Sequence, residues 1–356
     1  MKRNEIESKV DNIFAISQPE KSRKGKVSRR MMATIAIIVS CFVITASAGL
    51  LTYYGKVETT ATVSQSVLLD GLDYTVAATD AIAVIAGNTE YTKHTIRNDA
   101  SVEAPIEFVM TGTGNEVNMY FYLLELQTKN SATAIWSGTG HTSGLPAYLE
   151  TTGTVGSGDE AKIHIDLPTG TTLSDIEEIS WWEYLNVGYP PHVDILITDG
   201  TNTDALVIEY AYNGHIGEAP MPYGALTGAW YQTFSDDGNG PSVVDDSAYC
   251  WLSSGPPGGT TIIGGTLADW KTGIVTGMPI GIVNKDTLVT AIEIEIDNWV
   301  VQSEAYVDDI QIKGTLDPIT TFVLLPLTEY GLNIVYTFDV SAMPGTYFYD
   351  IEVQPN

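Results

Sequence analysis

Residues 288–299 read LVTAIEIEIDNW, and between positions 292 and 297 three isoleucines alternate with three acids. A period of two predicts a β-strand with one apolar face, the pattern of an antiparallel sheet that is buried on one side only. We therefore expect the isoleucines to face a core and the acids to face solvent.

The composition of the whole chain also indicates strands. The chain holds 33 Gly, 16 Pro and 34 aromatic residues, and only 17% of it is charged. This composition is typical of many short strands joined by tight turns, and no window of 12 residues carries a convincing helical pattern. The sequence predicts an all-β protein whose 356 residues suffice for two β domains.

The segment that follows the opening stretch, residues 305–312, reads AYVDDIQI. It resembles the closing strand of jelly-roll carbohydrate-binding and concanavalin-like modules. All seven tryptophans fall between about 129 and 314. The resemblance implies a jelly-roll β-sandwich over residues 126–317.

Before residue 126 and after residue 317 the chain lacks tryptophan, but its alternating pattern still predicts strands. Residues 343–347 (MPGTY) resemble the PGTY corner of Ig-like sandwiches. We expect residues 72–125 and 318–356 to form one split Ig-like β-sandwich with the jelly roll inserted, because insertions into surface loops cost little. Three consecutive modules are the alternative.

The N-terminal part reads as an export segment. Residues 31–51 carry no charge and follow Arg29 and Arg30, and Ala46 and Ala48 form an A-x-A cleavage site that would place the new N-terminus at Gly49. We interpret residues 1–48 as a signal peptide with a basic n-region. An uncleaved signal anchor over residues 31–51 is the alternative, since 21 residues can span a bilayer. In either case, contact with a membrane would be limited to this segment.

Residues 49–71 would then begin the exported protein with an alternating strand. Its apolar set is Val57, Ala61, Val63, Val67 and Leu69. A strand of this kind ahead of a split sandwich resembles the TasA-like biofilm-matrix fibre proteins and the archaeal bundling pilins. That resemblance implies donor-strand insertion into a neighbouring copy, and hence a homopolymer. Pairing within its own sheet is the alternative.

The charge excludes one class of partner. The formal charge is −27; nine of the 17 basic and four of the 44 acidic residues lie in residues 1–48, so eight basic and 40 acidic residues remain, a net charge of −32. Binding to a nucleic-acid backbone requires clustered Lys and Arg, and we expect no nucleic-acid partner.

Neither the cysteines nor the histidines form a recognisable motif. Cys41 and Cys250 are too few for a disulfide scaffold, and the five histidines show no ligand spacing. No hydrolase motif is present, so we expect no enzymatic activity, with a secreted glycan hydrolase as the weakest reading.

Two sets of residues are candidate binding sites. The oxygen-rich turn with Asp199, Asn202 and Asp204 is a candidate Ca²⁺ site, and Asp308 with Asp309 is a second. Glycan binding needs exposed aromatic faces with polar neighbours. The aromatic candidates are Trp181, Trp182, Tyr184, Trp230 and Trp251.

Together these patterns predict a non-enzymatic, acidic protein of the cell surface or extracellular space. The first reading is a filament or matrix-fibre subunit that assembles through its N-terminal strand. The alternative is a monomeric anchored adhesin or carbohydrate-binding protein, with a polysaccharide or cell-surface glycan as its partner.

Overall fold

The structure is a computed structural model. It describes residues 67–73, 78–84, 89–112, 117–142, 144–213, 227–235, 240–255, 263–275, 283–316, 319–338 and 345–355. Residues 65–356 form one compact unit. In the described residues no helix is long and apolar enough to cross a membrane.

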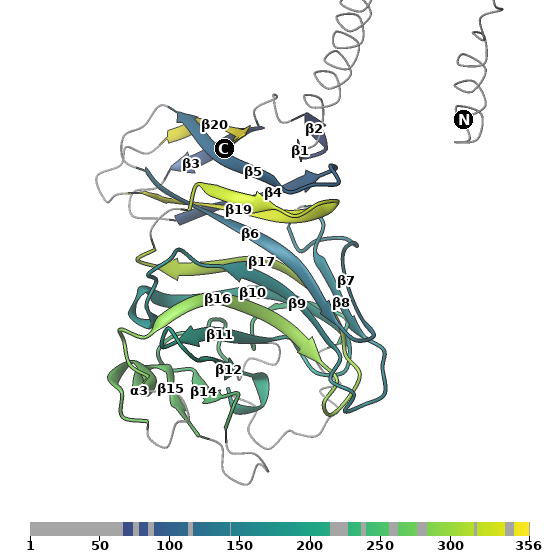
Figure 1. The fold of residues 1–356 in the computed structure, drawn as a ribbon, viewed down its shortest axis with the longest axis vertical. Helices are drawn as coiled ribbons and strands as arrows, with labels where there is room; N and C mark the ends of the chain where they lie inside the picture. The colour runs from purple at the N-terminus through teal and green to yellow at the C-terminus, as the bar shows by residue number, and fades with distance from the viewer. Residues whose placement is uncertain are drawn as a thin grey trace, which may run out of the picture. The chain divides into compact units, whose positions relative to one another are not determined.

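Three antiparallel sheets build this unit, so the predicted all-β class is confirmed (Figure 1). The largest sheet has eleven strands in the order β15-β14-β12-β11-β16-β9-β6-β19-β4-β1-β2. In that order, from one edge of the sheet to the other, its strands are Gly264–Thr266, Tyr249–Leu252, Thr203–Ile208, His192–Thr198, Leu288–Asp297, Glu160–Asp166, Val117–Lys129, Thr328–Phe338, Thr89–Asn98, Val67–Leu69 and Leu72–Asp73.

Two smaller sheets complete the unit. The five-stranded sheet has the order β13-β10-β17-β8-β7, with strands Trp230–Gln232, Ile176–Val187, Glu304–Gly314, Ala147–Thr151 and Ala132–Trp136. The four-stranded sheet has the order β18-β5-β20-β3, with strands Thr321–Leu324, Ala104–Gly112, Gly345–Pro355 and Ala78–Val84. The helical elements described are α3 (Leu267–Thr272) and the 3₁₀ turns Leu173–Asp175 and Tyr210–Tyr212.

Strand β6 belongs to both halves of the large sheet. Its residues 117–124 pair with β19, and its residues 125–129 pair with β9. Figure 1 shows β6 running from beside β19 toward β9. Phe121 on one face of β6 enters one hydrophobic cluster, whereas Tyr122 and Leu124 on the other face enter a second. The four-stranded and five-stranded sheets therefore cover opposite faces of the large sheet.

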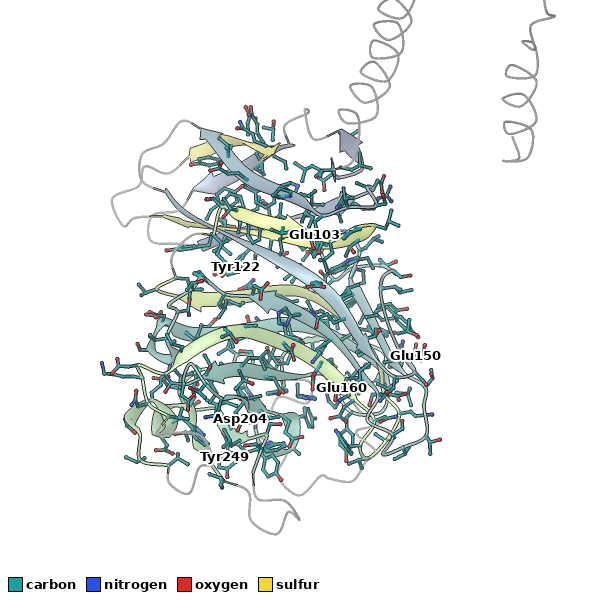
Figure 2. All side chains as sticks on the ribbon, viewed as in Figure 1. Glu103, Tyr122, Glu150, Glu160, Asp204 and Tyr249 are labelled. Atoms are coloured by element: carbon teal, nitrogen blue, oxygen red, sulfur yellow. The ribbon has the colours of Figure 1, made fainter. Side chains whose placement is uncertain are left out.

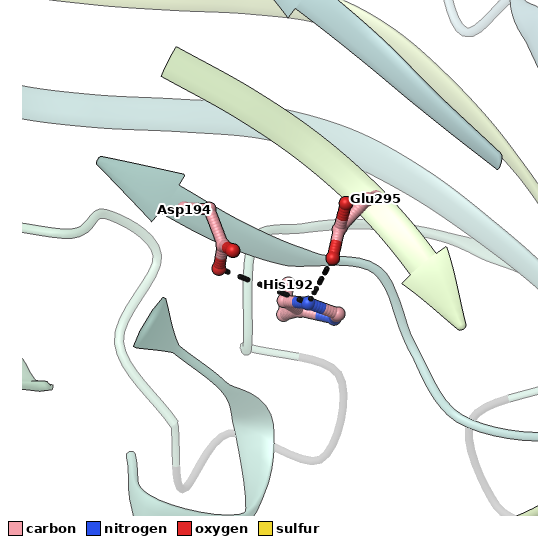
Figure 3. Close-up of side chains that lie close together, drawn as sticks. All are labelled: His192, Asp194 and Glu295. Atoms are coloured by element: carbon pink, nitrogen blue, oxygen red, sulfur yellow. Dashed lines mark hydrogen bonds and ion pairs between the residues drawn. The ribbon is translucent and has the colours of Figure 1, made fainter. Parts of the chain in front are cut away.

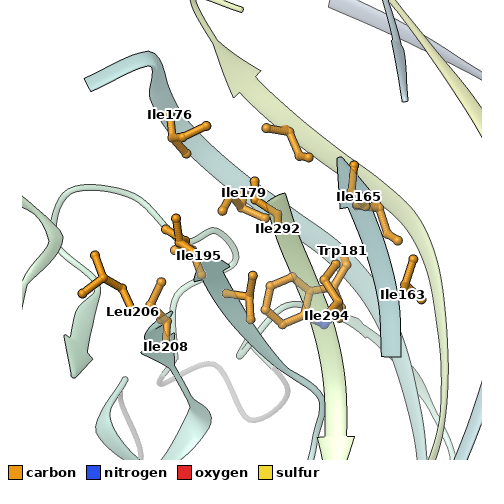
Figure 4. Close-up of a cluster of buried hydrophobic side chains, with 14 of the residues drawn as sticks. Ile163, Ile165, Ile176, Ile179, Trp181, Ile195, Leu206, Ile208, Ile292 and Ile294 are labelled. Carbon is orange, nitrogen blue, oxygen red and sulfur yellow. The ribbon is translucent and has the colours of Figure 1, made fainter. Parts of the chain in front are cut away.

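The larger of the two clusters lies between β16, β11 and β9 on one side and β10 and β17 on the other (Figure 4). Ile292 and Ile294 are fully buried in it and Ile296 is 1% exposed, as the alternation predicts. The prediction was wrong for two of the acids, since Glu293 and Glu295 are only 6% and 8% exposed. They lie on the opposite face of β16, where ion pairs with neighbouring strands cover them.

The N-terminal strand is described only from Val67 onward. In β1, Val67 and Leu69 pair with Asn98 and Ile96 of β4 and are 5% and 2% exposed. They complete the sheet of their own chain, which is the alternative to insertion into a neighbour. Val57, Ala61 and Val63 lie outside the described residues, as do Ala46, Ala48 and Gly49.

Candidate functional site

One register row of aromatic side chains crosses the five-stranded sheet. Trp230 of β13 is opposite Tyr184 of β10, Tyr184 is opposite Tyr306 of β17, and Tyr306 is opposite Tyr148 of β8. All four are half-buried, and the residues between them along the strands point into the core. We call Trp230, Tyr184, Tyr306 and Tyr148 the aromatic row.

The rings of the aromatic row touch in sequence but do not share a plane. Successive ring centroids are 5.7, 6.2 and 5.1 Å apart, and successive planes are tilted by 61°, 73° and 51°. Two of the three contacts, Trp230–Tyr184 and Tyr184–Tyr306, are edge-to-face, and they stabilise the row because the positive edge of one ring meets the negative face of the next. The result is a ridged aromatic surface rather than a flat one.

The described part of the β7–β8 loop, residues 137–142 and 144–146, borders the aromatic row. Gly138 lies against the Tyr306 ring; a Cβ placed there would come within 2.7 Å of Tyr306 Cε1, and its φ of +107° also favours glycine. His141 stacks on Trp182 with centroids 3.7 Å apart and planes 11° apart. One face of Trp182 is therefore already covered by this loop.

A row of polar side chains lies beside the aromatic row on the same face of the sheet. Asn186, Glu304 and Glu150 are each two residues along the strand from Tyr184, Tyr306 and Tyr148. Asn186 Nδ2 donates to Glu304 Oε1 at 2.8 Å, and Glu304 is opposite Glu150 in the register. The pKa of Tyr148 is raised, first by burial and to a smaller extent by the charges of Glu304 and Glu150. Figure 2 labels Glu150, which is a residue of β8. Aromatic faces and hydrogen-bonding oxygens thus lie on one surface.

A second group of polar side chains lies on the large sheet. His192 and Asp194 of β11 meet Glu295 of β16 (Figure 3). His192 Nε2 is 3.1 Å from Glu295 Oε1 and 3.8 Å from Asp194 Oδ1. The three donor atoms lie within 4.8 Å of one another. We call these three residues the His192 cluster.

Burial and the neighbouring charges together shift the pKa values of the His192 cluster. Burial raises the pKa of Asp194 to about 8. The negative charge of Glu295 also raises it, whereas the charge of His192 lowers it. Burial alone would lower the pKa of His192, but the hydrogen bond with Glu295 and the charges of Glu295 and Asp194 raise it to about 10. For Glu295 burial acts upward, yet the bond from His192 leaves its pKa below the ordinary value.

The predicted glycan residues separate into three places. Trp182, Tyr184 and Trp230 lie on the outer face of the five-stranded sheet. The prediction was wrong for Trp181, which is fully buried and donates Nε1–H to Glu183 Oε2. Neighbours on a strand face opposite sides, so Trp181 and Trp182 could not both face solvent. Trp251 lies on β14 of the large sheet, where its Nε1 donates to Glu209.

The predicted Ca²⁺ residues do not converge in the described part of the chain. Asp199 accepts hydrogen bonds from Thr201 N and Asn202 N within its turn, and Asp204 accepts from Ser254. The two bonds to Asp199 order the hairpin turn, whereas the bond to Asp204 joins β12 to the residues that follow β14. Calcium at this turn stays a prediction.

The second predicted Ca²⁺ pair already has basic partners. Lys93 of β4 lies 2.8 Å from Asp308 and 2.7 Å from Asp309, and His141 Nδ1 contacts Asp309. These bonds hold the β7–β8 loop and β4 to β17. Here too calcium stays a prediction.

Sequence reasoning missed Tyr148, Tyr306 and the His192 cluster. Tyr306 stood inside the AYVDDIQI strand, and its alternation with Ala305 and Val307 signals that it faces away from the core. His192 and Asp194 are likewise two apart on one strand. Their partner Glu295 is 103 residues away, and only the strand pairing shows it.

Comparisons with known proteins find no matching family model and no matching curated protein. Two similar solved structures are a family 11 carbohydrate-binding module of the cellulosomal cellulase Lic26A-Cel5E of Clostridium thermocellum and a family 11 module from the same organism in complex with a β-1,3-1,4-mixed-linked tetrasaccharide. Each is 14% identical, with TM-scores of 0.30 and 0.29. The matches cover 59% and 60% of this chain and 89% and 98% of those chains. A likeness of this size assigns neither a family nor a ligand.

Proposed function

We propose that this protein is a non-enzymatic carbohydrate-binding protein of the cell surface or extracellular space, which binds a polysaccharide chain along the aromatic row. The observation that carries the proposal is the register: four aromatic side chains from four adjacent strands stand on one half-exposed face. An aromatic ring offers its apolar face to the C–H face of a pyranose, while neighbouring oxygens bind the hydroxyls.

The geometry favours a single glycan chain over a crystalline surface. A flat polymer surface contacts only rings that lie in one plane, and here successive rings are tilted by 51–73°. Each step along the row is comparable with the length of one sugar unit, so a chain lying across the strands would meet one ring per sugar.

Charge narrows the class of glycan to neutral polymers. Glu304 and Glu150 lie beside the aromatic row, and the whole chain carries a formal charge of −27. A polyanion would be repelled by this surface, whereas uncharged hydroxyls can donate hydrogen bonds to carboxylates.

The experiment is a binding assay on a panel of soluble neutral β-glucans and polyanionic polysaccharides, by calorimetry and by retardation in polysaccharide gels. We expect binding to at least one neutral polymer, lost or weakened roughly 10-fold or more in Tyr184→Ala and in Trp230→Ala, since burying a large apolar side chain contributes about 1.5–3 kcal/mol. The matched control is Trp299→Ala, because Trp299 is 61% exposed and outside the row.

Binding that survives both row variants, or that falls equally in Trp299→Ala, would contradict the proposal. Turnover of any glycan by the purified protein would contradict its non-enzymatic part.

The filament reading is not proposed further, because the described part of its assembly strand, Val67–Leu69, is paired and buried within its own chain.

A further inference from the structure

We propose that the His192 cluster is a binding site for a divalent first-row transition metal of the Zn²⁺ class, with His192, Asp194 and Glu295 as its three protein ligands. This site is separate from the aromatic row: the cluster is built by β11 and β16 of the large sheet, and the row by the five-stranded sheet. It is also none of the oxygen-rich turns that the sequence suggested for calcium.

The donor distances suit one small ion. Zn²⁺ binds nitrogen and oxygen ligands at about 2.0–2.2 Å, so two ligands of a tetrahedral site are about 3.4 Å apart. The two distances from His192 Nε2, 3.1 Å to Glu295 and 3.8 Å to Asp194, lie on either side of that value. Three protein ligands leave a fourth position for water, the arrangement of open zinc sites.

Asp194 supplies an independent observation. Asp194 is only 9% exposed. Its Oδ1, which is the oxygen nearer His192 Nε2, accepts no hydrogen bond from the described residues. A buried carboxyl oxygen without a hydrogen-bond partner is destabilising. A metal ion between Oδ1 and Nε2 would satisfy it.

The charges around the cluster also call for a cation. The acidic groups of Asp297 and Glu209 are close enough to attract a positive charge on His192, and Glu293 is close enough to repel a negative charge on Asp194. Lys162 Nζ lies 3.5 Å from Glu295 but is shared with Glu293 at 2.7 Å. Acidic groups therefore outnumber basic ones around these three residues, as is common at metal sites.

The ligand set argues against calcium at this place. Ca²⁺ takes six to eight oxygen ligands, whereas here one of three donors is an imidazole nitrogen and the residues are largely buried. Imidazole with two carboxylates is a ligand set that suits zinc and its neighbours in the first row.

The same sheet offers a matched control in His164. Its Nδ1 lies 2.8 Å from Glu293 and its Nε2 lies 3.2 Å from Asp166. The two carboxylates thus contact opposite nitrogens of the ring, so no single ion could join all three. His164 resembles His192 in strand setting and charge, but not in geometry.

The test uses the untagged full-length protein after treatment with a chelator. We expect calorimetry to show one Zn²⁺ per chain, thermal unfolding to shift upward with Zn²⁺ but not with the same concentration of Ca²⁺, and Co²⁺ to give the visible absorption of a tetrahedral ion. His192→Gln and Asp194→Asn should each weaken Zn²⁺ binding by more than the roughly 10–100-fold that loss of an outer-shell partner costs, and His164→Gln should leave it unchanged.

Asp194→Asn keeps the side-chain volume and removes the charge, so it carries the test if His192→Gln fails to fold. The proposal is overturned if the wild-type protein binds no Zn²⁺, if Asp194→Asn binds it as tightly as the wild type, or if His164→Gln abolishes binding to the same extent.

Discussion

The imidazole of His164 is held between two carboxylates on the large sheet, and this makes it a reporter of pH. Hydrogen bonds with Asp166 and then with Glu293 raise its pKa from 6.5 to about 9, against the effect of burial. A raised pKa in the folded state means that the folded protein binds the proton more tightly than the unfolded chain does. The resulting stability is fully present below pH 6.5 and is lost as the pH rises through 9.

We therefore predict that His164→Gln lowers the free energy of unfolding by about 1–2 kcal/mol at pH 6, after allowance for solvent screening at this partly exposed ring, and by much less at pH 9.5. Urea unfolding of both proteins across this range measures the difference. A gap that is constant, or that widens with pH, would show that the His164 charge does not contribute in this way.

At the scale of one element, β1 shows how a short strand can be tied to its own sheet. Leu69 is 2% exposed in the smaller hydrophobic cluster, whereas Leu68, its neighbour, faces the other side and is half-buried. If β1 contributes to the fold of its own chain, removing the Leu69 side chain must destabilise the monomer.

We predict that Leu69→Ala lowers the free energy of unfolding of the monomer by about 2–4 kcal/mol, through lost burial and the cavity left behind, and that Leu68→Ala costs under half as much. Denaturant unfolding at low protein concentration measures both. Equal and small effects would mean that β1 does not complete this sheet, and would restore the filament reading.

The elements also show what could be read from the sequence. The isoleucines of β16 gave the strand and its buried face, because the pattern of one strand is local. The covering of Glu293 and Glu295 could not be read, since it depends on Lys162 and His164 of β9 and on His192 of β11. The sequence did not indicate β7 and β8, or the role of Tyr148, because residues 132–136 and 147–151 are short and weakly alternating.

The two candidate sites differ in the same way. Tyr184 and Trp230 could be named from the sequence because aromatic residues on strands are visible one by one. Their alignment with Tyr306 and Tyr148 is a matter of register between four strands, and register depends on turns and bulges such as the shift between Ser180 and Trp182. The division into a split sandwich and an insert stays a prediction.

At the scale of the whole described unit, β6 links the two halves of the large sheet and the two hydrophobic clusters. Its first eight residues pair with β19 and its last five with β9, and side chains from its two faces enter the two hydrophobic clusters. One half of the large sheet cannot open without loosening the strand that borders the other half. Two nested folds joined only by loops would unfold separately.

We predict that residues 65–356 unfold in one cooperative transition, even though they contain two clusters. Ile351→Val in the smaller cluster and Ile294→Val in the larger one each remove one buried methyl group, at a cost of about 0.5–1.5 kcal/mol. In scanning calorimetry each variant should move the whole transition to lower temperature by a few degrees and leave its shape unchanged. If instead a variant splits the transition, with only one part moving, then β6 does not couple the two clusters, and each would have to be treated as an independently folding domain.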